Sequence, residues 1–283
     1  MAKLARGAPP SVIARFLGPG GFPRSRDGPV ASPDVTTPTP GRPLASGDLP
    51  DADHLPEGAE KVAAVRSMFD TIAPRYDLVN RVMTFRMDVG WRRRAVRALQ
   101  LPAESRVYDL ACGTGDLCEE LRRVGHRPVG FDLSFGMLLS SRTEAPLVHA
   151  DALRLPVPDA SADGVTCGFA LRNLEDLAPF FAELARVVRP HGRIALLEVA
   201  EPPNPVLRLG HSVYFGRVVP LIGGLLSDPA AYRYLPRSVS YLPPAERMLE
   251  MLDDAGFAPA HHDLLSVGIA RLLTATRRSD RTA

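Results

Sequence analysis

Two glycines in a turn after a predicted β-strand are the first residues whose spacing could serve chemistry. The apolar run 106–110 leads into Ala-Cys-Gly-Thr-Gly-Asp, which places glycines at Gly113 and Gly115. A glycine has no side chain, so the backbone at these positions can approach a bound ligand closely. A dinucleotide fingerprint requires a third glycine at a position where this chain has Cys118. The turn therefore predicts a ligand site that is not built for a pyrophosphate.

Acidic side chains stand at the ends of three successive predicted strands. Asp109 lies in the first strand, just before the glycine turn, and Asp132 ends the second, 17 residues beyond Gly115. A carboxylate at the second position can accept both hydroxyls of a ribose. Asp151 follows the third strand, where it can accept a hydrogen bond from the exocyclic amine of adenine. Together, the turn and these acids outline S-adenosylmethionine, although each alone is also consistent with a tight turn or a solvated loop acid.

The elements that position these residues follow an alternation of strand-like apolar runs and helical stretches. Several strands are short continuous apolar runs, as expected for strands that are buried on both faces. The alternation predicts a doubly wound α/β fold, in which helices cover a parallel sheet. The predicted strands are Arg106–Leu110, Pro128–Asp132, Leu147–Ala150, Gly164–Ala170, Arg193–Val199, Ala260–Val267 and Ala270–Thr276.

Helical spacing of apolar residues marks two of the connecting segments. The first is Leu177–Val188, with Asp176 placed to cap its N-terminus and Pro190-His191-Gly192 expected to end it. The second is Glu246–Asp254, closed by Gly256. The apolar residues of the first segment are assigned to the core and to no chemistry.

Composition and charge exclude several classes of function. The chain of 283 residues carries 34 basic and 32 acidic side chains, so its net charge of +2 gives no reason to expect a nucleic-acid partner. Its three cysteines have neither CxxC spacing nor a nearby histidine cluster, which predicts a reducing, cytoplasmic compartment and no bound metal. The chain has no run of about 18 uncharged apolar residues, so no membrane-spanning helix is predicted.

The first 58 residues differ in composition from the rest. They contain 11 of the 28 prolines and almost no periodic apolar pattern, so burial cannot offset the entropy of ordering them. Residues 1–58 are predicted to form a disordered extension, although their arginines and serines also allow a transit peptide. Residues 59–283 are predicted to form one catalytic domain, with a helical substrate-binding insertion at about 201–245.

Four stretches of the chain resemble the ubiquinone/menaquinone biosynthesis C-methyltransferase family. They include the YDLVN, LRN and YRYL elements and are residues 68–91, 109–117, 168–176 and 228–257. The resemblance extends over nearly all of residues 62–277. It implies a class I S-adenosylmethionine-dependent methyltransferase with a mostly parallel seven-stranded sheet and an antiparallel edge strand. It also implies methylation of a ring carbon in a reduced quinone precursor such as demethylmenaquinol.

By position, the resemblance implies cofactor contacts from Thr114, Asp132, Asp151 and Ala152. Gly168 stands where the family often has serine, so only the backbone can contact the cofactor there. The other departures from the family are Asp88 for histidine, Thr84 for serine, Val79 for methionine, His191 for glycine and Ala200 for serine. These departures bear on which ring is methylated rather than on the reaction class.

Four residues are predicted to act on the substrate ring. An aromatic carbon is a poor nucleophile unless a neighbouring hydroxyl loses its proton, so a reduced hydroquinone is the expected acceptor. Arg172 and Asn173 follow the fourth strand and are expected to orient and stabilise that oxygen, or alternatively to bond loop carbonyls. Tyr76 and Asp77 precede the first strand, and Asp77 is expected to accept a proton directly or through water. The alternatives are packing for Tyr76 and a helix cap for Asp77.

The insertion supplies the predicted substrate pocket. Tyr232, Arg233 and Tyr234 are expected to wall the ring, although one of the tyrosines alternatively belongs to the core. The apolar stretch 214–226 lines a path for an isoprenoid tail, contacts a bilayer surface or forms a buried lid helix. We expect a cytoplasmic enzyme that binds a prenylated quinol or small aromatic substrate, with peripheral membrane contact and a homodimer left open.

Three other functions are consistent with parts of the pattern. A methyltransferase of the same fold could act on oxygen, nitrogen or carbon of a soluble aromatic metabolite. A nicotinamide-dependent oxidoreductase shares the strand, the glycine turn and the ribose acid, but Cys118 argues against it. A non-catalytic sensor that keeps the cofactor pocket is disfavoured by Arg172, Asn173 and the segment Tyr232–Tyr234.

Overall fold

The structure, a computed structural model, describes residues 57–226, 228, 231, 234 and 237–279. The predicted extension over residues 1–58 lies outside this range except for its last two residues. Tyr232 and Arg233, two of the three residues predicted to wall the substrate ring, also lie outside it, whereas Tyr234 is described.

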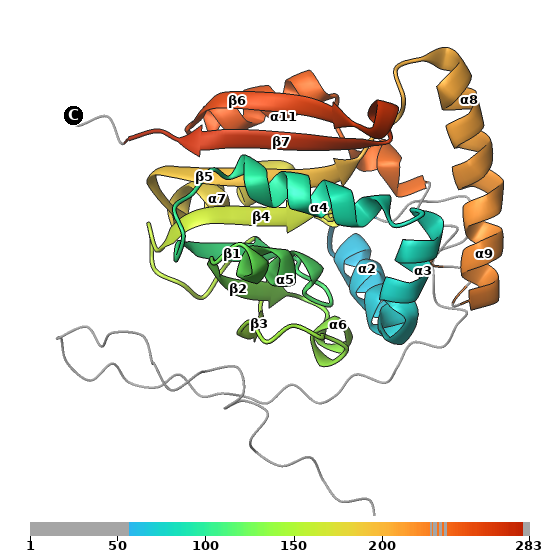
Figure 1. Cartoon of the computed structure of the whole chain (residues 1–283), viewed down its shortest axis with the longest axis horizontal. Coiled ribbons are helices and arrows are strands. Elements are labelled where there is room, and N and C mark those ends of the chain that lie inside the picture. Colours follow the sequence, from blue (N-terminus) through green and yellow to red (C-terminus); the bar gives the residue numbers. More distant parts are fainter. Residues whose placement is uncertain (1–56, 227, 229–230, 232–233, 235–236, 280–283) are drawn as a thin grey trace, which may run out of the picture. The chain divides into compact units, whose positions relative to one another are not determined.

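Seven strands among the described residues form one sheet (Figure 1). They are β1 (Arg106–Leu110), β2 (Arg127–Asp132), β3 (Leu147–His149), β4 (Ala162–Gly168), β5 (Val188–Val199), β6 (Phe257–Leu265) and β7 (Ala270–Arg277). The strand order is β3-β2-β1-β4-β5-β7-β6. β1 to β5 pair in parallel, and β7 is antiparallel to both of its neighbours. The predicted doubly wound, mostly parallel fold is confirmed, with an antiparallel pair at the β6 edge.

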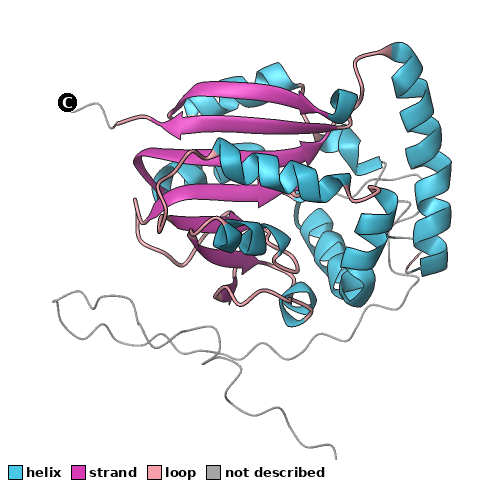
Figure 2. Cartoon of the chain, in the orientation of Figure 1, coloured by secondary structure: helices cyan, strands magenta, loops and turns pink. Residues whose placement is uncertain are grey.

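Helices cover both faces of this sheet, as Figure 2 shows. One face carries α4 (Met87–Ala98) and α5 (Asp116–Arg123). The other carries α7 (Leu177–Val187) and α11 (Ala245–Asp254). The central strands are therefore buried on both sides, which explains their continuous apolar sequences.

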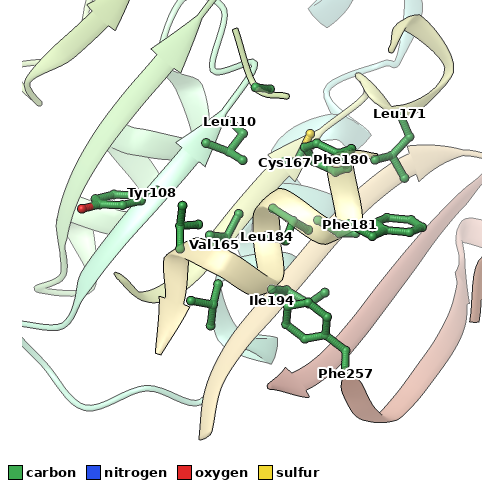
Figure 3. Close-up of a cluster of buried hydrophobic side chains, with 14 of the residues drawn as sticks. Tyr108, Leu110, Val165, Cys167, Leu171, Phe180, Phe181, Leu184, Ile194 and Phe257 are labelled. Carbon is green, nitrogen blue, oxygen red and sulfur yellow. The ribbon is translucent and has the colours of Figure 1, made fainter. Parts of the chain in front are cut away.

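The larger apolar layer is centred on α7 and is drawn in Figure 3. Phe180 and Phe181 of α7 and Phe257 of β6 are fully buried in it. Along β5, Ile194 belongs to this layer, whereas the next residue, Ala195, belongs to the layer under α4. This alternation follows from the two-residue period of a β-strand and ties both helical layers to one sheet.

The two ends of α7 differ in how well the sequence predicts them. Asp176 caps the N-terminus, because its side chain accepts a hydrogen bond from the backbone N–H of Ala178 at 2.9 Å. The predicted stop at Pro190–Gly192 is wrong, since the helix ends at Val187 and β5 begins at the next residue. The pairing of β4 with β5 shifts register here, so residues 190–192 form an irregularity within the strand.

A third group of helices lies at the carboxyl ends of the parallel strands, where the predicted site residues are. It consists of α2 (Gly58–Ile72), η1 (Ala73–Arg75), α3 (Tyr76–Met83), α6 (Phe135–Leu139), α8 (Pro205–Val213), η3 (Tyr214–Val218) and α9 (Val219–Leu226). Except for α8, these helices share a small apolar core that includes Met68, Val79, Met137 and Val219. In the part of the chain that the structure describes, no helix has the length and apolar character needed to span a bilayer.

Candidate active site

Two adjoining cavities lie at the carboxyl ends of the parallel strands. The first, here called the cofactor cleft, is lined by residues at the ends of β1, β2, β3 and β4 and by α2. The second, here called the apolar pocket, has a volume of about 410 Å³ and is lined mainly by α3, α4, α8 and η3. Tyr76 and Phe169 line both cavities. These two aromatic rings therefore mark the place where the cavities meet.

The two glycines of the predicted turn have different environments. Gly113 lines the cofactor cleft and has a φ of +57°, a left-handed conformation that glycine adopts without strain. Gly115, with a φ of +89°, is the N-cap of α5 and does not line the cleft. A Cβ at Gly115 would lie 2.5 Å from Cγ2 of Thr143. The first glycine leaves the backbone open to a ligand, and the second permits close packing of the loop.

Asp132 is held at the end of β2 by two backbone hydrogen bonds. Gly113 N–H donates to Oδ2 at 2.7 Å, and Ser134 N–H donates to Oδ1 at 2.7 Å. Burial raises the pKa of Asp132, while these two bonds act in the opposite direction. Each carboxylate oxygen keeps further acceptor capacity, so the side chain can accept two hydroxyl groups from the cleft.

Asp151, Ala152 and Gly168 line the same cleft from the ends of β3 and β4. Asp151 is exposed, and its Oδ1 accepts a hydrogen bond from the backbone N–H of Leu153 at 2.9 Å. A Cβ at Gly168 would lie 2.8 Å from Cδ1 of Leu117 in α5. The close approach of α5 to β4 therefore explains why this position holds glycine.

Two other predicted cofactor residues lie beneath the turn and do not line the cleft. Asp109 is fully buried and accepts hydrogen bonds from Thr166 Oγ1 at 2.8 Å and Cys118 Sγ at 3.4 Å. Burial raises the pKa of Asp109 to about 7, against the effect of these two donors. The Thr114 hydroxyl donates to Asp77 Oδ1 at 2.6 Å. Both side chains thus hold the glycine turn in place from the side that faces away from the cleft.

The apolar pocket combines a hydrophobic wall with a few polar groups. Its hydrophobic residues include Met83, Phe85, Trp91, Phe215, Val219 and Ile269. Its polar side chains include Tyr76, Asn80, Thr84, Asp88, Arg92, Arg172, His211 and Tyr214. A cavity of this size and composition is typical of sites for small, largely apolar molecules.

Tyr76 and Asp77 are neighbours in α3 but have different surroundings. Tyr76 stands where the cavities meet, and burial raises the pKa of its phenol, so it stays protonated at neutral pH. Asp77 is buried, accepts the hydrogen bond from Thr114 and lines neither cavity. Asp77 thus links α3 to the glycine turn, and its predicted role as proton acceptor stays a prediction.

Arg172, in the single turn η2 (Leu171–Asn173), reaches the wall of the apolar pocket. Its guanidinium forms a buried ion pair with Glu198 of β5, and its Nη1 also donates to the Phe169 carbonyl at 2.8 Å. Its Nε donates to Ser238 Oγ at 3.1 Å. Glu198 was missed by sequence reasoning, although a carboxylate within the apolar run 193–199 was a signal for it.

Asn173 lines the cofactor cleft, whereas the preceding Arg172 lines the apolar pocket. The Oδ1 of Asn173 accepts a hydrogen bond from the Tyr234 hydroxyl at 3.4 Å. Burial raises the pKa of Tyr234, so its hydroxyl keeps the proton that it donates. Of the three residues predicted to wall the ring, Tyr234 is therefore tied to the loop that carries Arg172 and Asn173.

A second buried ion pair in the apolar pocket was not predicted. Asp88 and Arg92, one helical turn apart in α4, form a salt bridge, and Thr84 Oγ1 donates to Asp88 at 2.7 Å. Arg92 also lies 3.3 Å from Asp116. Burial alone would raise the pKa of Asp88, but Thr84 and Arg92 outweigh it and lower that pKa. In the sequence, the four-residue spacing of Asp88 and Arg92 could have indicated this ion pair.

Sequence comparison finds relatives that align with nearly their full length. A model of the ubiE/COQ5 methyltransferase family matches residues 57–277. A demethylmenaquinone methyltransferase from Roseiflexus castenholzii is 39% identical over 232 residues, which cover 79% of this chain and 98% of that protein. The enzyme of the same name from Thermus thermophilus is 44% identical over 215 residues, covering 72% and 97%. A ubiquinone/menaquinone biosynthesis C-methyltransferase UbiE from Syntrophotalea carbinolica is 39% identical over 221 residues, covering 75% and 93%.

Comparison with solved structures finds the same fold at lower sequence identity. A chain from the complex of the Haloferax volcanii Trm112 methyltransferase activator with a methyltransferase aligns with a TM-score of 0.55 and 17% identity, covering 75% of this chain and 98% of that chain. A SAM-dependent methyltransferase from Thermotoga maritima aligns with a TM-score of 0.54 and 17% identity, covering 76% and 100%. At this level of identity the likeness concerns the fold alone.

Proposed function

Because this chain belongs to the ubiE/COQ5 methyltransferase family, and so is an S-adenosylmethionine-dependent methyltransferase, we propose that its substrate is a reduced, prenylated quinone precursor such as demethylmenaquinol. The methyl group would go to a ring carbon of that quinol. The observation that carries the proposal is the apolar pocket that adjoins the polar cofactor cleft at Tyr76 and Phe169. A quinol ring with an apolar tail matches such a pocket better than a charged metabolite does.

The cofactor cleft has features that fit S-adenosylmethionine. A Cβ built on Gly113 meets no atom within 4 Å, so open space lies against the backbone there. Asp132 offers both carboxylate oxygens to ribose hydroxyls, and Asp151 with Ala152 lies where the adenine would bind. Gly113 would contact the methionine part of the molecule. When bound, the cofactor supplies a methyl group carried on a sulfonium.

The chain's own residues orient the ring and stabilise its oxygen. The Nη2 group of Arg172 has no hydrogen-bond partner among the described residues, while the rest of the guanidinium is fixed by Glu198 and the Phe169 carbonyl. We propose that Nη2 donates to the oxygen beside the reacting carbon. A donor that is already fixed stabilises developing negative charge without reorganising. Tyr76 would hold the ring at the meeting point of the two cavities.

The tail of the proposed substrate would leave the pocket beside α8. Val206, Leu209 and Val213, spaced along one face of this helix, have exposed fractions of 78%, 69% and 46%. Arg208 and Arg217 are exposed nearby, and residues 202–226 contain no aspartate or glutamate. An apolar helical face with cationic neighbours suits contact with an anionic lipid surface. We therefore propose that the protein docks on a bilayer through α8 and draws its substrate from it.

The direct test is methyl transfer to defined acceptors. Purified protein is incubated anaerobically with methyl-labelled S-adenosylmethionine and a panel of naphthoquinols and benzoquinols, with and without a short prenyl tail. We expect label on a ring carbon of a prenylated quinol, located by mass spectrometry. Label on a quinol oxygen, or efficient transfer only to the quinols without a tail, would contradict the proposal.

A further inference from the structure

A further cavity, here called the outer groove, lies against α8 and η3, and the proposed function gives it no role. It has a volume of about 480 Å³, and its lining includes Leu209, Ser212 and Gly216. The apolar pocket is lined instead by Leu207 and Gly210 of the same helical run. Neighbouring residues of a helix point about 100° apart, so these two sets lie on different faces. The helical run therefore stands between two cavities.

The apolar pocket and the outer groove adjoin on the inner side of this helical run. The residues that line both are His211 of α8, Phe215 of η3, Val199 at the end of β5, and Val239 of η4 (Val239–Tyr241). His211 and Phe215 are four residues apart, so they lie on one helical face. Because Val199 ends a strand, the shared wall lies between the helix and the end of the sheet. An elongated molecule could therefore occupy both cavities.

The helical run between the cavities has no buried residue. This holds for every position of α8 and η3, from Pro205 to Val218. Helices of globular proteins are normally stabilised by burying an apolar face. In addition, η3 is a π-helix, a rare conformation that often occurs at functional sites. The apolar side chains along this run keep accessible surface toward both cavities, which suits an apolar occupant.

The polar groups of the outer groove do not form a site for a charged ligand. The guanidinium of Arg208 donates to two backbone carbonyls, each at 3.0 Å. Glu201 and Ser212 are exposed. Burial lowers the pKa of His211, which keeps its imidazole neutral at pH 7. The other described lining residues are apolar or glycine, so the groove continues the apolar wall of the pocket.

We propose that the outer groove binds the first part of the substrate's prenyl tail, which passes between α8 and the end of β5. This inference rests on the proposed function, in which the quinol ring lies in the apolar pocket, and adds a second binding site to it. A prenyl tail is a hydrocarbon bonded to the ring, so it starts in the pocket and has no polar group that needs a partner. Burial of its carbons in the groove contributes to binding in proportion to the apolar area removed from water.

The test measures how tail length changes binding to the full chain in the presence of S-adenosylhomocysteine. The ligands are 1,4-naphthoquinols with no tail, one prenyl unit or two, kept reduced under anaerobic conditions. We expect the two-unit quinol to bind the wild type about tenfold more tightly than the tail-less one. Gly216→Leu places a side chain in the outer groove, where a Cβ meets no heavy atom within 4 Å beyond its own helix backbone. This variant is expected to bind all three quinols with dissociation constants that agree within about twofold.

Controls separate an effect on the tail from an effect on the ring or on folding. Gly90→Leu makes the same substitution at an exposed position of α4, outside both cavities, and is expected to keep the wild-type affinities. Gly210→Leu places the side chain in the apolar pocket and is expected to weaken the binding of all three quinols alike. The melting temperature and the affinity for S-adenosylhomocysteine report whether each variant is folded. Ser212→Leu, on the same wall as Gly216, serves the same test should Gly216→Leu fail to fold.

An unchanged preference for the prenylated quinols in folded Gly216→Leu would overturn the inference, and so would an equal loss of affinity for all three quinols. Wild-type affinities that do not depend on tail length would also overturn it and would leave the groove to another apolar chain, such as that of a membrane lipid. Activity of the wild type separates these failures from that of the proposed function. Wild-type protein that binds prenylated quinols with the expected preference but never methylates them contradicts the proposed function and supports the role of the outer groove.

Discussion

At the scale of single residues, cofactor recognition depends most on Asp132. Its carboxylate is fixed by Gly113 and Ser134 and lines the cleft. Two hydrogen bonds from ribose hydroxyls to a charged acceptor are worth about 3 kcal/mol, so Asp132→Ala is expected to weaken S-adenosylmethionine binding about 100-fold. Titration calorimetry measures this, with Asp254→Ala at an exposed position of α11 as the control. Equal affinities of the wild type and Asp132→Ala for S-adenosylmethionine would contradict the assignment of Asp132 to the ribose.

Arg172 is expected to affect turnover and not cofactor binding. Its guanidinium lines the apolar pocket, outside the cofactor cleft. Arg172→Lys keeps a positive charge beside Glu198 but loses the planar set of donors, and is expected to lower kcat about 100-fold with an unchanged dissociation constant for S-adenosylmethionine. Arg172→Ala is less informative, because an unpaired buried Glu198 destabilises the fold. Steady-state kinetics measure this effect. A kcat of Arg172→Lys equal to that of the wild type would contradict the proposed role of Arg172 in stabilising the substrate oxygen.

Asp109 links stability to pH. Burial raises the pKa of Asp109 from 3.8 to about 7. The folded state then holds more protons than the unfolded state between these values, so stability falls as the pH rises through that window. Asp109→Asn removes this contribution. Between pH 5 and pH 8, the free energy of unfolding of the wild type is expected to fall by about 3 kcal/mol more than that of the variant. Urea unfolding at each pH measures this difference. Parallel pH profiles would contradict the assignment.

Site residues at the ends of strands could be predicted from the sequence, because the strand end fixes where they lie. Asp132 and Asp151 follow strands that run parallel, so their arrival at one cleft could be predicted from the topology. Tyr76 and Asp77 could not be separated in this way, because neighbouring positions of a helix point about 100° apart and only the packing of α3 decides which faces a cavity.

At the scale of elements, α2 is the helix whose attachment controls the cofactor cleft. Ser134 Oγ donates to Asp70 at 2.6 Å near one end of α2, and Lys61 Nζ donates to the Leu174 carbonyl near the other end. Lys61 also lies over the Tyr241 ring, 3.8 Å from its centroid. Burial lowers the pKa of Lys61. The helix is therefore fastened at both ends across the cleft that its Phe69 helps to line.

Lys61→Met is expected to loosen the first half of α2 without unfolding the sheet. The loss of a buried, charged donor lowers the free energy of local opening by about 1–2 kcal/mol. Hydrogen exchange measured by mass spectrometry should show faster exchange over residues 58–66 and unchanged protection in β1 and β4. Glu60→Met, in the adjacent and exposed position, is the matched control. Unchanged exchange in α2 would show that Lys61 does not hold the helix.

The elements themselves divide into those that sequence predicts well and those that it does not. All seven strands were predicted, although β5 and β6 begin earlier than expected. In central strands such as β1 and β4, burial on both faces favours apolar residues, whereas β6 alternates between buried and less buried positions. The end of α7 was missed because Pro190 and Gly192, which usually stop a helix, occupy an irregularity in β5. The bounds of α8, η3 and α9 were not predicted. η3 and α9 pack on α2, α3 and α6 and not on the sheet, and α8 has no buried residue, so the spacing of buried positions gave no signal for them.

For the whole molecule, the exposed apolar face of α8 predicts docking on a bilayer. Vesicles that contain anionic lipid are expected to carry the wild type upward in a flotation gradient, and neutral vesicles to carry less. Leu209→Glu places a charge on the exposed face, away from the pocket wall, and should abolish flotation while activity on a tail-less quinol is kept. The control is Leu264→Glu, on an exposed position of β6. Flotation that survives Leu209→Glu would contradict docking through α8.

We expect a cofactor in the cofactor cleft and a quinol ring in the apolar pocket to meet between Tyr76 and Phe169. A crystal structure with S-adenosylhomocysteine and a short-chain naphthoquinol tests this arrangement. In that structure we expect the ribose hydroxyls to bind Asp132, the sulfur to face the two aromatic rings, and the quinol ring to lie on the Arg172 side of them. A nucleoside bound away from Asp132, or a ring outside the pocket lined by α8 and Arg172, would contradict it.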